Sequence, residues 1–475
     1  MNSKNNILNR YDIICIGAGP GGLNVASFMN RIGLKVLLID KTDSNIGGDC
    51  LNTGCVPSKA LIHIANQAYE AKKFQKYSDT TIGVTDLKKV MQYIKDKQNV
   101  IRKHENASYF QKKGIDVVLG EAKFSGKDKV IVNNKEYSAK KIILATGSSP
   151  RKLKISGIEK VDYLTNENIF ELNILPKNFL IIGGGPIGIE IGQAFSRLGS
   201  NVTIIQNSDQ FLPKEDTEIS KILCKQLKAE GVNLLFETKT LEFNSTNTLI
   251  IERKGKKETV FFDKVLISIG RELNIHGLDL EKAGIEINSD GRKLKVNDYL
   301  QTTNKNVYVC GDVAGSYQFT HAAELHAGIL INNFFNPLKK KKLNYDNFSW
   351  VTYTSPEIAT FGLNEEILKK RKESYEVIYL DFEDDDRAIV EESTLGKIKL
   401  FIHKDKILGG TMIAKNAGEL IQELILAKVG NIPLRKIFAK IYPYPVASRI
   451  NKKILSTHYS KKLTPFIKRI FKLLY

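Results

Sequence analysis

The sequence predicts an α/β protein with two Rossmann-like dinucleotide-binding domains and a C-terminal α+β domain. A glycine-rich turn between a buried strand and a helix occurs near residue 17 and again near residue 183, which is typical of dinucleotide-binding βαβ units. After about residue 345 the pattern changes to short alternating strands, which indicates a separate domain. The length of 475 residues agrees with this division, because a single hydrophobic core does not grow to that size.

The first glycine-rich turn contains Gly17, Gly19 and Gly22. It follows a buried strand, opens a helix and is trailed by a second strand that ends at Asp40. Glycines let the backbone approach a pyrophosphate, the helix N-terminus supplies N–H groups, and an acidic residue can accept hydrogen bonds from a ribose. The pattern predicts a dinucleotide site, and a purely structural turn is the alternative.

The second turn contains Gly183, Gly185 and Gly188, and the strand after its helix is followed by Gln206. An acidic residue at that place would bond the ribose of NAD, whereas an arginine would favour NADP. Gln206 does neither, since an amide can bond a hydroxyl or tolerate a phosphate. The basic Lys214 nearby in sequence favours NADPH, with NADH as the alternative.

Other elements are expected around these units. A short buried strand over 142–145 ends at Thr146 and Gly147, and another over 307–310 precedes Asp312. The remaining predictions are helices over 60–77, 86–113, 364–372 and 417–429, antiparallel strands near 127–137 and 248–262, and C-terminal strands over 350–356, 397–402 and 408–414.

Cys50 and Cys55 lie between the two dinucleotide signatures. Five helical residues rise about 7.5 Å, whereas a disulfide needs Cα atoms about 4.4–6.8 Å apart, so the chain must bend, and Asn52 and Gly54 tolerate such a bend. Pro57 and the helix-forming residues after it place Cys55 near a helix N-terminus, where the macrodipole lowers the pKa of a thiol. The pattern favours a redox-active dithiol over two unrelated buried cysteines.

The composition limits the partners. The net charge of +19 favours anionic partners such as nucleotide cofactors or an acidic membrane surface, but no zinc-ligand spacing or aromatic–basic module supports nucleic-acid binding, and no metal site is predicted. Five cysteines in so long a chain do not form a disulfide scaffold, which predicts a reducing, cytoplasmic location. Cys15, Cys224 and Cys310 are interpreted as packing residues.

These motifs together resemble the flavin-dependent pyridine nucleotide–disulfide oxidoreductases. Besides the two glycine turns, the resemblance rests on the C-x4-C-x-P-S-K stretch that ends at Lys59, on Ala145-Thr-Gly147, on Gly270-Arg271 and on Cys310-Gly-Asp312. It implies a homodimer. It also implies an FAD-binding domain formed by residues 10–150 and 277–345, an NAD(P)-binding domain over 151–276 and a dimerisation domain over 346–450. Residues 451–475 are then left as a basic amphipathic C-terminal tail.

The resemblance also implies roles for single residues. The cofactor contacts would be Gly17, Gly19, Gly22, Asp40, Thr146, Gly147 and Asp312 for FAD, and Gly183, Gly185, Gly188 and Gln206 for the nicotinamide nucleotide. Gly270 would be a further cofactor contact. Lys59 would lie beside the flavin and pair with Glu190, with two exposed charges as the alternative. Electrons would pass from NAD(P)H through FAD to a Cys50–Cys55 disulfide, with Cys55 next to the flavin and Cys50 exchanging with the acceptor.

The C-terminal motif departs from the pattern of the disulfide-reducing members. Disulfide-reducing members carry a His-Pro-Thr motif and a following glutamate, whereas Tyr444 and Arg449 stand in those places here. A phenol with a pKa of about 10 is a poor base at neutral pH. The resemblance is therefore closer to mercuric reductase, although no cysteine pair follows Cys310, and a soft metal ion, a small oxidant or a quinone remain open as acceptors. Tyr444 would be a donor or weak ligand there, or an interface aromatic.

The last residues, 461–475, predict a basic amphipathic helix that Thr464 caps and Pro465 starts. Its apolar face would carry Phe466, Ile467, Ile470, Phe471 and Leu474, and its basic face Lys468, Arg469 and Lys472. Such a helix suits peripheral contact with the inner face of an anionic membrane, and a helix packed on the body or a disordered end are the alternatives. For the whole chain, the alternatives are a dihydrolipoyl dehydrogenase and a non-catalytic, membrane-associated FAD-binding protein.

Overall fold

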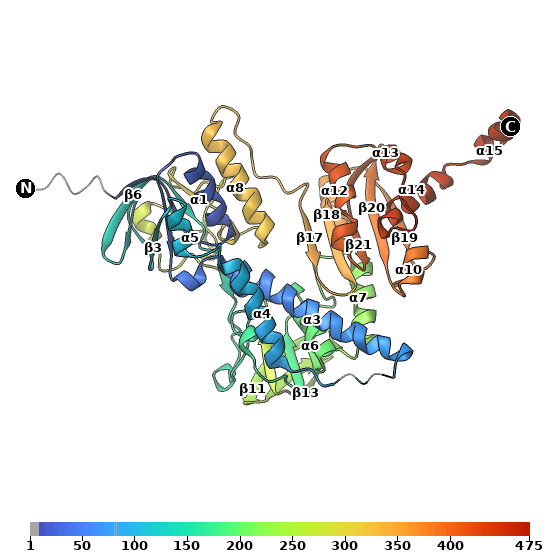
Figure 1. Ribbon diagram of the computed structural model, residues 1–475, viewed down its shortest axis with the longest axis horizontal. Coiled ribbons are helices and arrows are strands. Elements are labelled where there is room, and N and C mark those ends of the chain that lie inside the picture. Colours follow the sequence, from blue (N-terminus) through green and yellow to red (C-terminus); the bar gives the residue numbers. More distant parts are fainter. Residues whose placement is uncertain (1–8, 80, 82) are drawn as a thin grey trace, which may run out of the picture. The chain divides into compact units, whose positions relative to one another are not determined.

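The computed structural model describes residues 9–79, 81 and 83–475. The chain divides into two compact units (Figure 1). The first contains the residues up to Pro176, Ser245–Asn247 and Lys264–Leu343, and the second contains Lys177–Asn244, Thr248–Asp263 and Asn344–Tyr475.

The first unit is built on a central sheet in which β1 lies between β2 and β6 and runs parallel to both. The parallel strands are β1 (Arg10–Ile16), β2 (Val36–Asp40), β3 (Asp116–Leu119), β6 (Lys135–Leu144) and β16 (Val307–Val309). The antiparallel strands β4 (Lys123–Gly126) and β5 (Lys129–Val132) continue from β6. Helices α1 (Pro20–Arg31) and α8 (Thr320–Phe335) pack against each other beside this sheet (Figure 1). The strand expected over 142–145 is thus the end of a longer strand.

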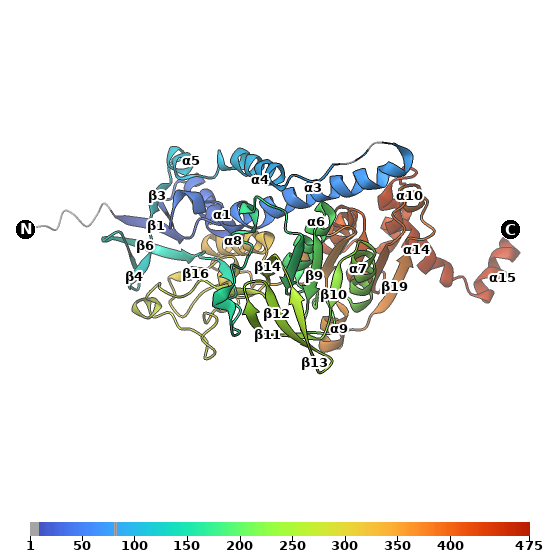
Figure 2. The ribbon, with the colours of Figure 1, turned by 90° about the horizontal axis from the view of Figure 1, so that it is seen from below.

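Four helices follow β2 in the same unit: α2 (Gly48–Asn52), α3 (Cys55–Phe74), α4 (Leu87–Arg102) and α5 (Ala107–Lys112). Figure 2 shows α4 running beside α3. The prediction of one helix over 86–113 is wrong, because the chain breaks at Asn106. Its side chain accepts a hydrogen bond from the Tyr109 N–H and begins a new helix.

The unit is completed by short elements. Strands β7 (Ser148–Pro150) and β15 (Arg271–Leu273) pair antiparallel, and Leu266 of β14 (Lys264–Ile267) bridges Leu164. The single 3₁₀ turns are η1 (Asp43–Asn45), η2 (Gln75–Tyr77), η3 (Ile158–Lys160), η4 (Ile169–Glu171), η5 (Leu280–Ala283) and η6 (Asp312–Ala314).

The second unit begins with another parallel βαβ arrangement. It consists of β8 (Asn178–Ile182), α6 (Pro186–Leu198), β9 (Asn201–Ile205), α7 (Thr217–Ala229) and β10 (Asn233–Leu235). An antiparallel sheet of β11 (Thr238–Ser245), β12 (Thr248–Arg253) and β13 (Lys256–Phe261) follows, which confirms the antiparallel strands expected near 248–262.

The C-terminal part of the second unit is an antiparallel sheet in the order β17-β18-β21-β20-β19. Its strands are β17 (Ser349–Thr352), β18 (Glu357–Gly362), β19 (Glu376–Asp381), β20 (Lys397–His403) and β21 (Lys406–Ala414), so the sequence missed β18 and β19. The helical elements are α9 (Glu365–Arg371), α10 (Asp386–Val390), α11 (Ala417–Leu420), α12 (Gln422–Val429), α13 (Leu434–Ala439), η7 (Ala447–Arg449), α14 (Ile450–Lys461) and α15 (Pro465–Leu474).

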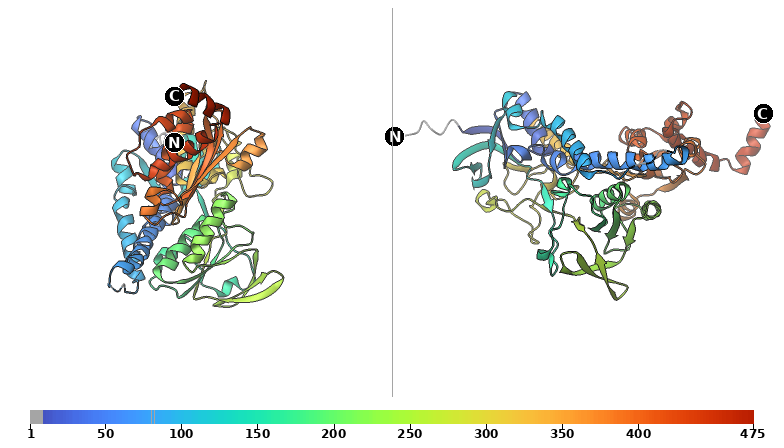
Figure 3. Two further views of the ribbon diagram at one scale, coloured as in Figure 1. Left: turned by 90° about the vertical axis from the view of Figure 1, so that its right-hand side faces the viewer. Right: turned by 60° about the horizontal axis from the view of Figure 1, so that its bottom comes forward.

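Helix α15 differs from the other helices because it buries none of its residues. The Thr464 hydroxyl accepts a hydrogen bond from the Ile467 N–H, which confirms the predicted cap. Figure 3 shows α15 following α14 at the end of the chain. Within the described residues, no helix has the length and apolar character that a bilayer crossing requires.

Candidate active site

The two glycine turns have nearly the same backbone geometry. Gly17 and Gly183 adopt φ of +104° and +117°, and Gly19 and Gly185, which precede α1 and α6, share φ of −80° with ψ of −177° and −179°. Neither helix start is capped by a side chain. The N–H groups of both first turns therefore face outward without a side-chain acceptor, as a pyrophosphate site requires.

The glycines differ in what surrounds them. A Cβ at Gly17 would stand 2.2 Å from the Ala145 carbonyl oxygen, and one at Gly22 would stand 1.9 Å from the Gly17 carbonyl oxygen. At Gly185 no atom lies within 4 Å of such a Cβ. Close approach of neighbouring backbone therefore demands glycine at positions 17 and 22, whereas the space beside Gly185 is open.

The residues that end β2 and follow β9 make equivalent hydrogen bonds. The Ala18 N–H donates to Asp40 Oδ2 at 2.6 Å, and the Gly184 N–H donates to Gln206 Oε1 at 3.1 Å. Gln206 Nε2 also donates to Ser208 Oγ at 2.7 Å. Burial raises the pKa of Asp40. Gln206 thus accepts a hydrogen bond from the glycine turn as Asp40 does, but it carries no negative charge.

The turn at Thr146 and Gly147 is fixed by Asn274. Thr146 Oγ1 donates to the Asn274 carbonyl oxygen at 2.7 Å, and Asn274 Nδ2 returns a bond to the Thr146 carbonyl oxygen at 2.9 Å. Gly147 and Gly270 both have positive φ, at +70° and +110°. Asp312 begins η6, and burial raises the pKa of its half-buried carboxyl.

The two cysteines lie on either side of a helix break, as predicted. Cys50 is in α2, Cys55 is the first residue of α3, and the chain turns at Thr53 and Gly54. Both are free thiols, which corresponds to the reduced form of the pair.

The two thiols share a hydrogen bond with opposite effects on their acidity. This bond from Cys50, helped by the Thr320 hydroxyl and the charge of Lys59, lowers the pKa of Cys55 to about 6. Thr320 Oγ1 lies 3.3 Å from Cys55 Sγ. The same shared bond, followed by burial, raises the pKa of Cys50. Cys55 is the stable thiolate of the pair, as its place at a helix N-terminus predicts.

Helix α4 holds the dithiol segment, residues 47–55, in its bent form. Gln98 Nε2 donates to the carbonyl oxygens of Leu51 and Asn52 at 2.9 and 2.8 Å, and Arg102 Nη2 donates to Asn52 Oδ1 at 2.5 Å. No sequence motif marks Gln98, Arg102 or Thr320 as site residues, because each side chain reaches the dithiol segment from a distant part of the chain.

Lys59 and Glu190 lie in different units. Lys59 Nζ, on α3, donates to Ser58 Oγ at 3.3 Å. Glu190, on α6, is 6% exposed, and its Oε1 accepts a bond from the Tyr353 N–H at 2.9 Å. Their predicted pairing stays a prediction.

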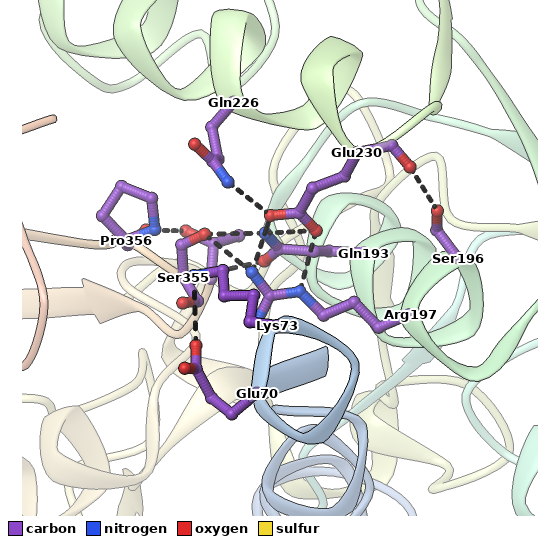
Figure 4. A network of polar contacts seen from close by, with 10 residues as sticks. Glu70, Lys73, Gln193, Ser196, Arg197, Gln226, Glu230, Ser355 and Pro356 are labelled. Atoms are coloured by element: carbon purple, nitrogen blue, oxygen red, sulfur yellow. Dashed lines mark hydrogen bonds and ion pairs between the residues drawn. The ribbon is translucent and has the colours of Figure 1, made fainter. Parts of the chain in front are cut away.

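Glu190 belongs to a polar stripe on α6 that also contains Gln193 and Arg197. Figure 4 shows Gln193 and Arg197 beside Glu230 and Ser355. Gln193 exchanges hydrogen bonds of 2.8 Å with the backbone of Ser355 in both directions. Arg197 forms a buried ion pair of 2.6 Å with Glu230. The helix that opens at the second glycine turn is thus bonded to the segment that leads into β18.

Tyr444 and Arg449 lie together at the surface of the second unit. Tyr444 is 69% exposed, and the Arg449 guanidinium carbon lies 5.5 Å from the centre of its ring. This is a cation–π contact, in which neither group acts as a base. The phenol remains available to a partner surface or a small molecule.

The fold and the site together define an oxidoreductase with two dinucleotide sites and a thiol pair in one chain. Residues 11–327 match the model of the pyridine nucleotide-disulphide oxidoreductase family, and residues 348–453 match its dimerisation domain. The chain belongs to this family. It is therefore an NAD(P)H oxidoreductase that uses FAD and a disulfide, with the predicted α/β fold, and the dimerisation domain supports a homodimer.

Several relatives span nearly the whole chain. A mercuric reductase of Lysinibacillus sphaericus is 34% identical over 447 residues, which cover 92% of this chain and 80% of that protein. A dihydrolipoyl dehydrogenase of Mycoplasma genitalium is 33% identical over 449 residues, covering 93% and 96%. Among solved structures, the HOCl-induced flavoprotein disulfide reductase RclA from Escherichia coli has a TM-score of 0.83 at 26% identity, covering 94% of this chain and 99% of that chain.

Proposed function

We propose that this protein reduces a small, non-disulfide acceptor with electrons from NADPH, through FAD and the Cys50–Cys55 pair. The observation that carries the proposal is the stabilised thiolate of Cys55 beside Cys50, combined with Tyr444 and Arg449 in the places of the usual base and its carboxylate. Without that acid–base group, no side chain at this place can protonate the thiolate that leaves when a disulfide substrate is reduced. A soft metal ion, a small oxidant or a quinone fits this site better than lipoamide.

In the proposed reaction, NADPH gives two electrons and one proton to the Cys50–Cys55 disulfide, which becomes the Cys50 thiol and the Cys55 thiolate, and NADP⁺ is released. Bound FAD supplies the two-electron chemistry between the nicotinamide and the disulfide. Cys55 then stays as the thiolate, and Cys50 attacks the acceptor. Its two electrons leave with the reduced product as the disulfide forms again.

The proposed binding residues follow the two glycine turns. For FAD they are Gly17, Gly19, Gly22, Asp40, Thr146, Gly147 and Asp312, with Lys59 beside the ring and paired with Glu190. For the nicotinamide nucleotide they are Gly183, Gly185, Gly188, Gln206 and Gly270. Support comes from the uncapped starts of α1 and α6 and from the open space at Gly185.

Two observations support NADPH over NADH. Gln206 places no negative charge after β9, where a carboxylate would repel a 2′-phosphate. Lys214 lies in the same connection and adds a positive charge. Steady-state kcat/KM values for the two nucleotides test this preference, and a higher value for NADH would reject it.

An anaerobic titration tests the main proposal. Adding NADPH to the enzyme is expected to produce the long-wavelength absorbance of a thiolate next to oxidised flavin, and this absorbance should persist down to about pH 6, where Cys55 takes up its proton. A non-catalytic FAD-binding protein would show no such band. A following screen with mercuric ion, hydrogen peroxide, menadione and lipoamide identifies the acceptor class, and fastest turnover with lipoamide would favour the dihydrolipoyl dehydrogenase alternative.

We also propose that α15 contacts an anionic membrane surface. Its apolar side chains are exposed, with Phe466 at 71% and Leu474 at 79%, and Lys468, Arg469 and Lys472 accompany them. An exposed apolar face beside cationic side chains is typical of interfacial helices. The membrane would be the cytoplasmic face, where anionic lipids collect.

Deleting residues 461–475 tests this contact. The full chain is expected to sediment with vesicles of phosphatidylglycerol and phosphatidylcholine, and the truncated chain to stay in the supernatant. The matched control replaces Phe466 and Phe471 by serine, which keeps the positive charge but removes apolar area. Equal sedimentation of the full and truncated chains would reject the proposal.

A further inference from the structure

The side chain of Asp49 lies across the bend between the two cysteines. Asp49 precedes Cys50 in α2, and its Oδ1 accepts a hydrogen bond of 2.5 Å from Thr53 Oγ1. Its Oδ2 stands 3.0 Å from the place that a Cβ on Gly54 would take. The carboxylate therefore covers Gly54, the residue immediately before Cys55 and the start of α3.

Two residues from distant parts of the first unit hold this carboxylate. Asn166, which is 8% exposed, donates from Nδ2 to Asp49 Oδ1 at 3.0 Å and to the Thr53 carbonyl oxygen at 3.3 Å. Arg271 Nη2 lies 3.4 Å from Asp49 Oδ2. The dithiol segment is thus held by Asn166 and Arg271 in addition to the contacts from α4.

Arg271 continues the chain of contacts towards Asp312. Its side chain is 10% exposed, its Nε donates to Ser148 Oγ at 2.7 Å, and its Nε lies 3.8 Å from Asp312 Oδ2. Ser148 Oγ in turn donates to Asp312 at 2.5 Å. A guanidinium this deeply buried needs negative partners, and Asp49 and Asp312 supply them from two sides.

We propose that Asp49 is a positioning residue of the dithiol: its carboxylate, tied through Arg271 to Asp312, fixes the bend between Cys50 and Cys55 and keeps a negative charge beside Cys55. The inference rests on the proposed redox role of the pair. The charge has a definite consequence, because a carboxylate near a thiol disfavours the thiolate. Asp49 raises the pKa of Cys55 against the larger lowering effects of Cys50, Thr320 and Lys59.

The groups that act on the pair come from several elements. On Cys55 they are Cys50 and Asp49 from α2, Lys59 from α3 and Thr320 from α8. Glu105, which follows α4, acts on Cys50 and raises its pKa. Asp49 itself faces Arg271 of β15. Removing the charge of Asp49 should therefore make Cys55 more acidic, and removing Arg271 should leave Asp49 uncompensated and make Cys55 less acidic.

The test compares Asp49→Asn, which keeps the shape and the acceptor for Thr53, with Arg271→Gln in the full-length holoenzyme. After reduction by NADPH, the pH midpoint of the long-wavelength absorbance is expected to fall in Asp49→Asn by on the order of half a pH unit, and to rise in Arg271→Gln. A second readout is the pH dependence of Cys55 alkylation by iodoacetamide, mapped by peptide mass analysis, which does not need the flavin band.

The matched control is Asp43→Asn. Asp43 is another carboxylate near the dithiol segment in sequence, but its Oδ1 accepts a hydrogen bond from the Ala107 N–H. The pH midpoint of the absorbance in the Asp43→Asn variant should therefore equal that of the wild type. A purely structural role of Asp49 would lower the melting temperature and leave the midpoint unchanged, which would overturn the inference, as would shifts of the same sign in the Asp49 and Arg271 variants. Absence of the band in the wild type would instead count against the proposed function, and the alkylation midpoints would still decide the role of Asp49.

Discussion

Replacing Cys50 by serine is expected to lower kcat/KM for the acceptor by about 10³-fold or more, because a serine hydroxyl is neither a thiolate nucleophile nor a group that can form the disulfide. The fold should be kept. Serine is only slightly smaller than cysteine. Its hydroxyl can still donate a hydrogen bond to Cys55, so the thiolate of Cys55 should persist. The measurement is steady-state turnover with NADPH and the best acceptor of the screen.

The matched control for this variant is Cys224→Ser. Cys224 is half-buried in α7 of the second unit, whereas the dithiol segment belongs to the first unit. Its replacement should leave turnover within about twofold of the wild type. If the Cys50 variant kept a tenth or more of the wild-type turnover, electrons would be reaching the acceptor without the thiol pair, and the proposed path would be wrong.

Replacing Gly17 by alanine is expected to destabilise the first unit by about 2–5 kcal/mol and to yield protein without FAD. Two costs add. A left-handed backbone conformation, with φ of +104°, costs a non-glycine residue about 1–2 kcal/mol, and a Cβ at 2.2 Å from the Ala145 carbonyl oxygen forces β1 away from β6 at a further cost of about 1–3 kcal/mol. Flavin absorbance per mole of purified protein and the melting temperature measure the two effects.

Gly33→Ala separates these two costs. Gly33 lies between α1 and β2 with φ of +88°, but nothing stands within 4 Å of an added Cβ. Only the backbone strain remains, so this variant should lose about 1–2 kcal/mol and keep its FAD. Equal behaviour of the two variants would show that the close approach of β1 and β6 at Gly17 is not what requires a glycine.

Local patterns predict the parts of the fold whose rules are local. The sequence predicted the glycine turns, the buried strands beside them and the cap at Thr464, because each depends on residues within one turn or one strand. The break at Asn106 was missed, although asparagine is a good N-cap, since apolar spacing continued through it. Strand β19 was missed because it is an edge strand with only partial burial, so its apolar alternation is weak.

The site was predictable to the same extent. Cys50, Cys55 and the helix start at Cys55 follow from spacing and from proline placement. The residues that tune the pair do not, because Arg271, Asn166 and Thr320 reach it from sequence distances at which no periodicity operates. Arg271 lies in a short strand, Asn166 in a turn and Thr320 at the start of α8. Only the tertiary fold shows which of the many such polar residues lie near the thiols.

The polar stripe on α6 bears on how this protein could be re-engineered. A cassette of residues 151–276, moved into another scaffold to change nucleotide preference, would carry the Arg197–Glu230 pair but lose the backbone of Tyr353 and Ser355. Glu190 would then lose its hydrogen bond with the Tyr353 N–H, and Gln193 would lose its two hydrogen bonds with Ser355. A viable chimaera is therefore expected to need the segment leading into β18 from the same parent, so that exchange boundaries lie beyond Gly362 rather than at the edges of the nucleotide-binding fold.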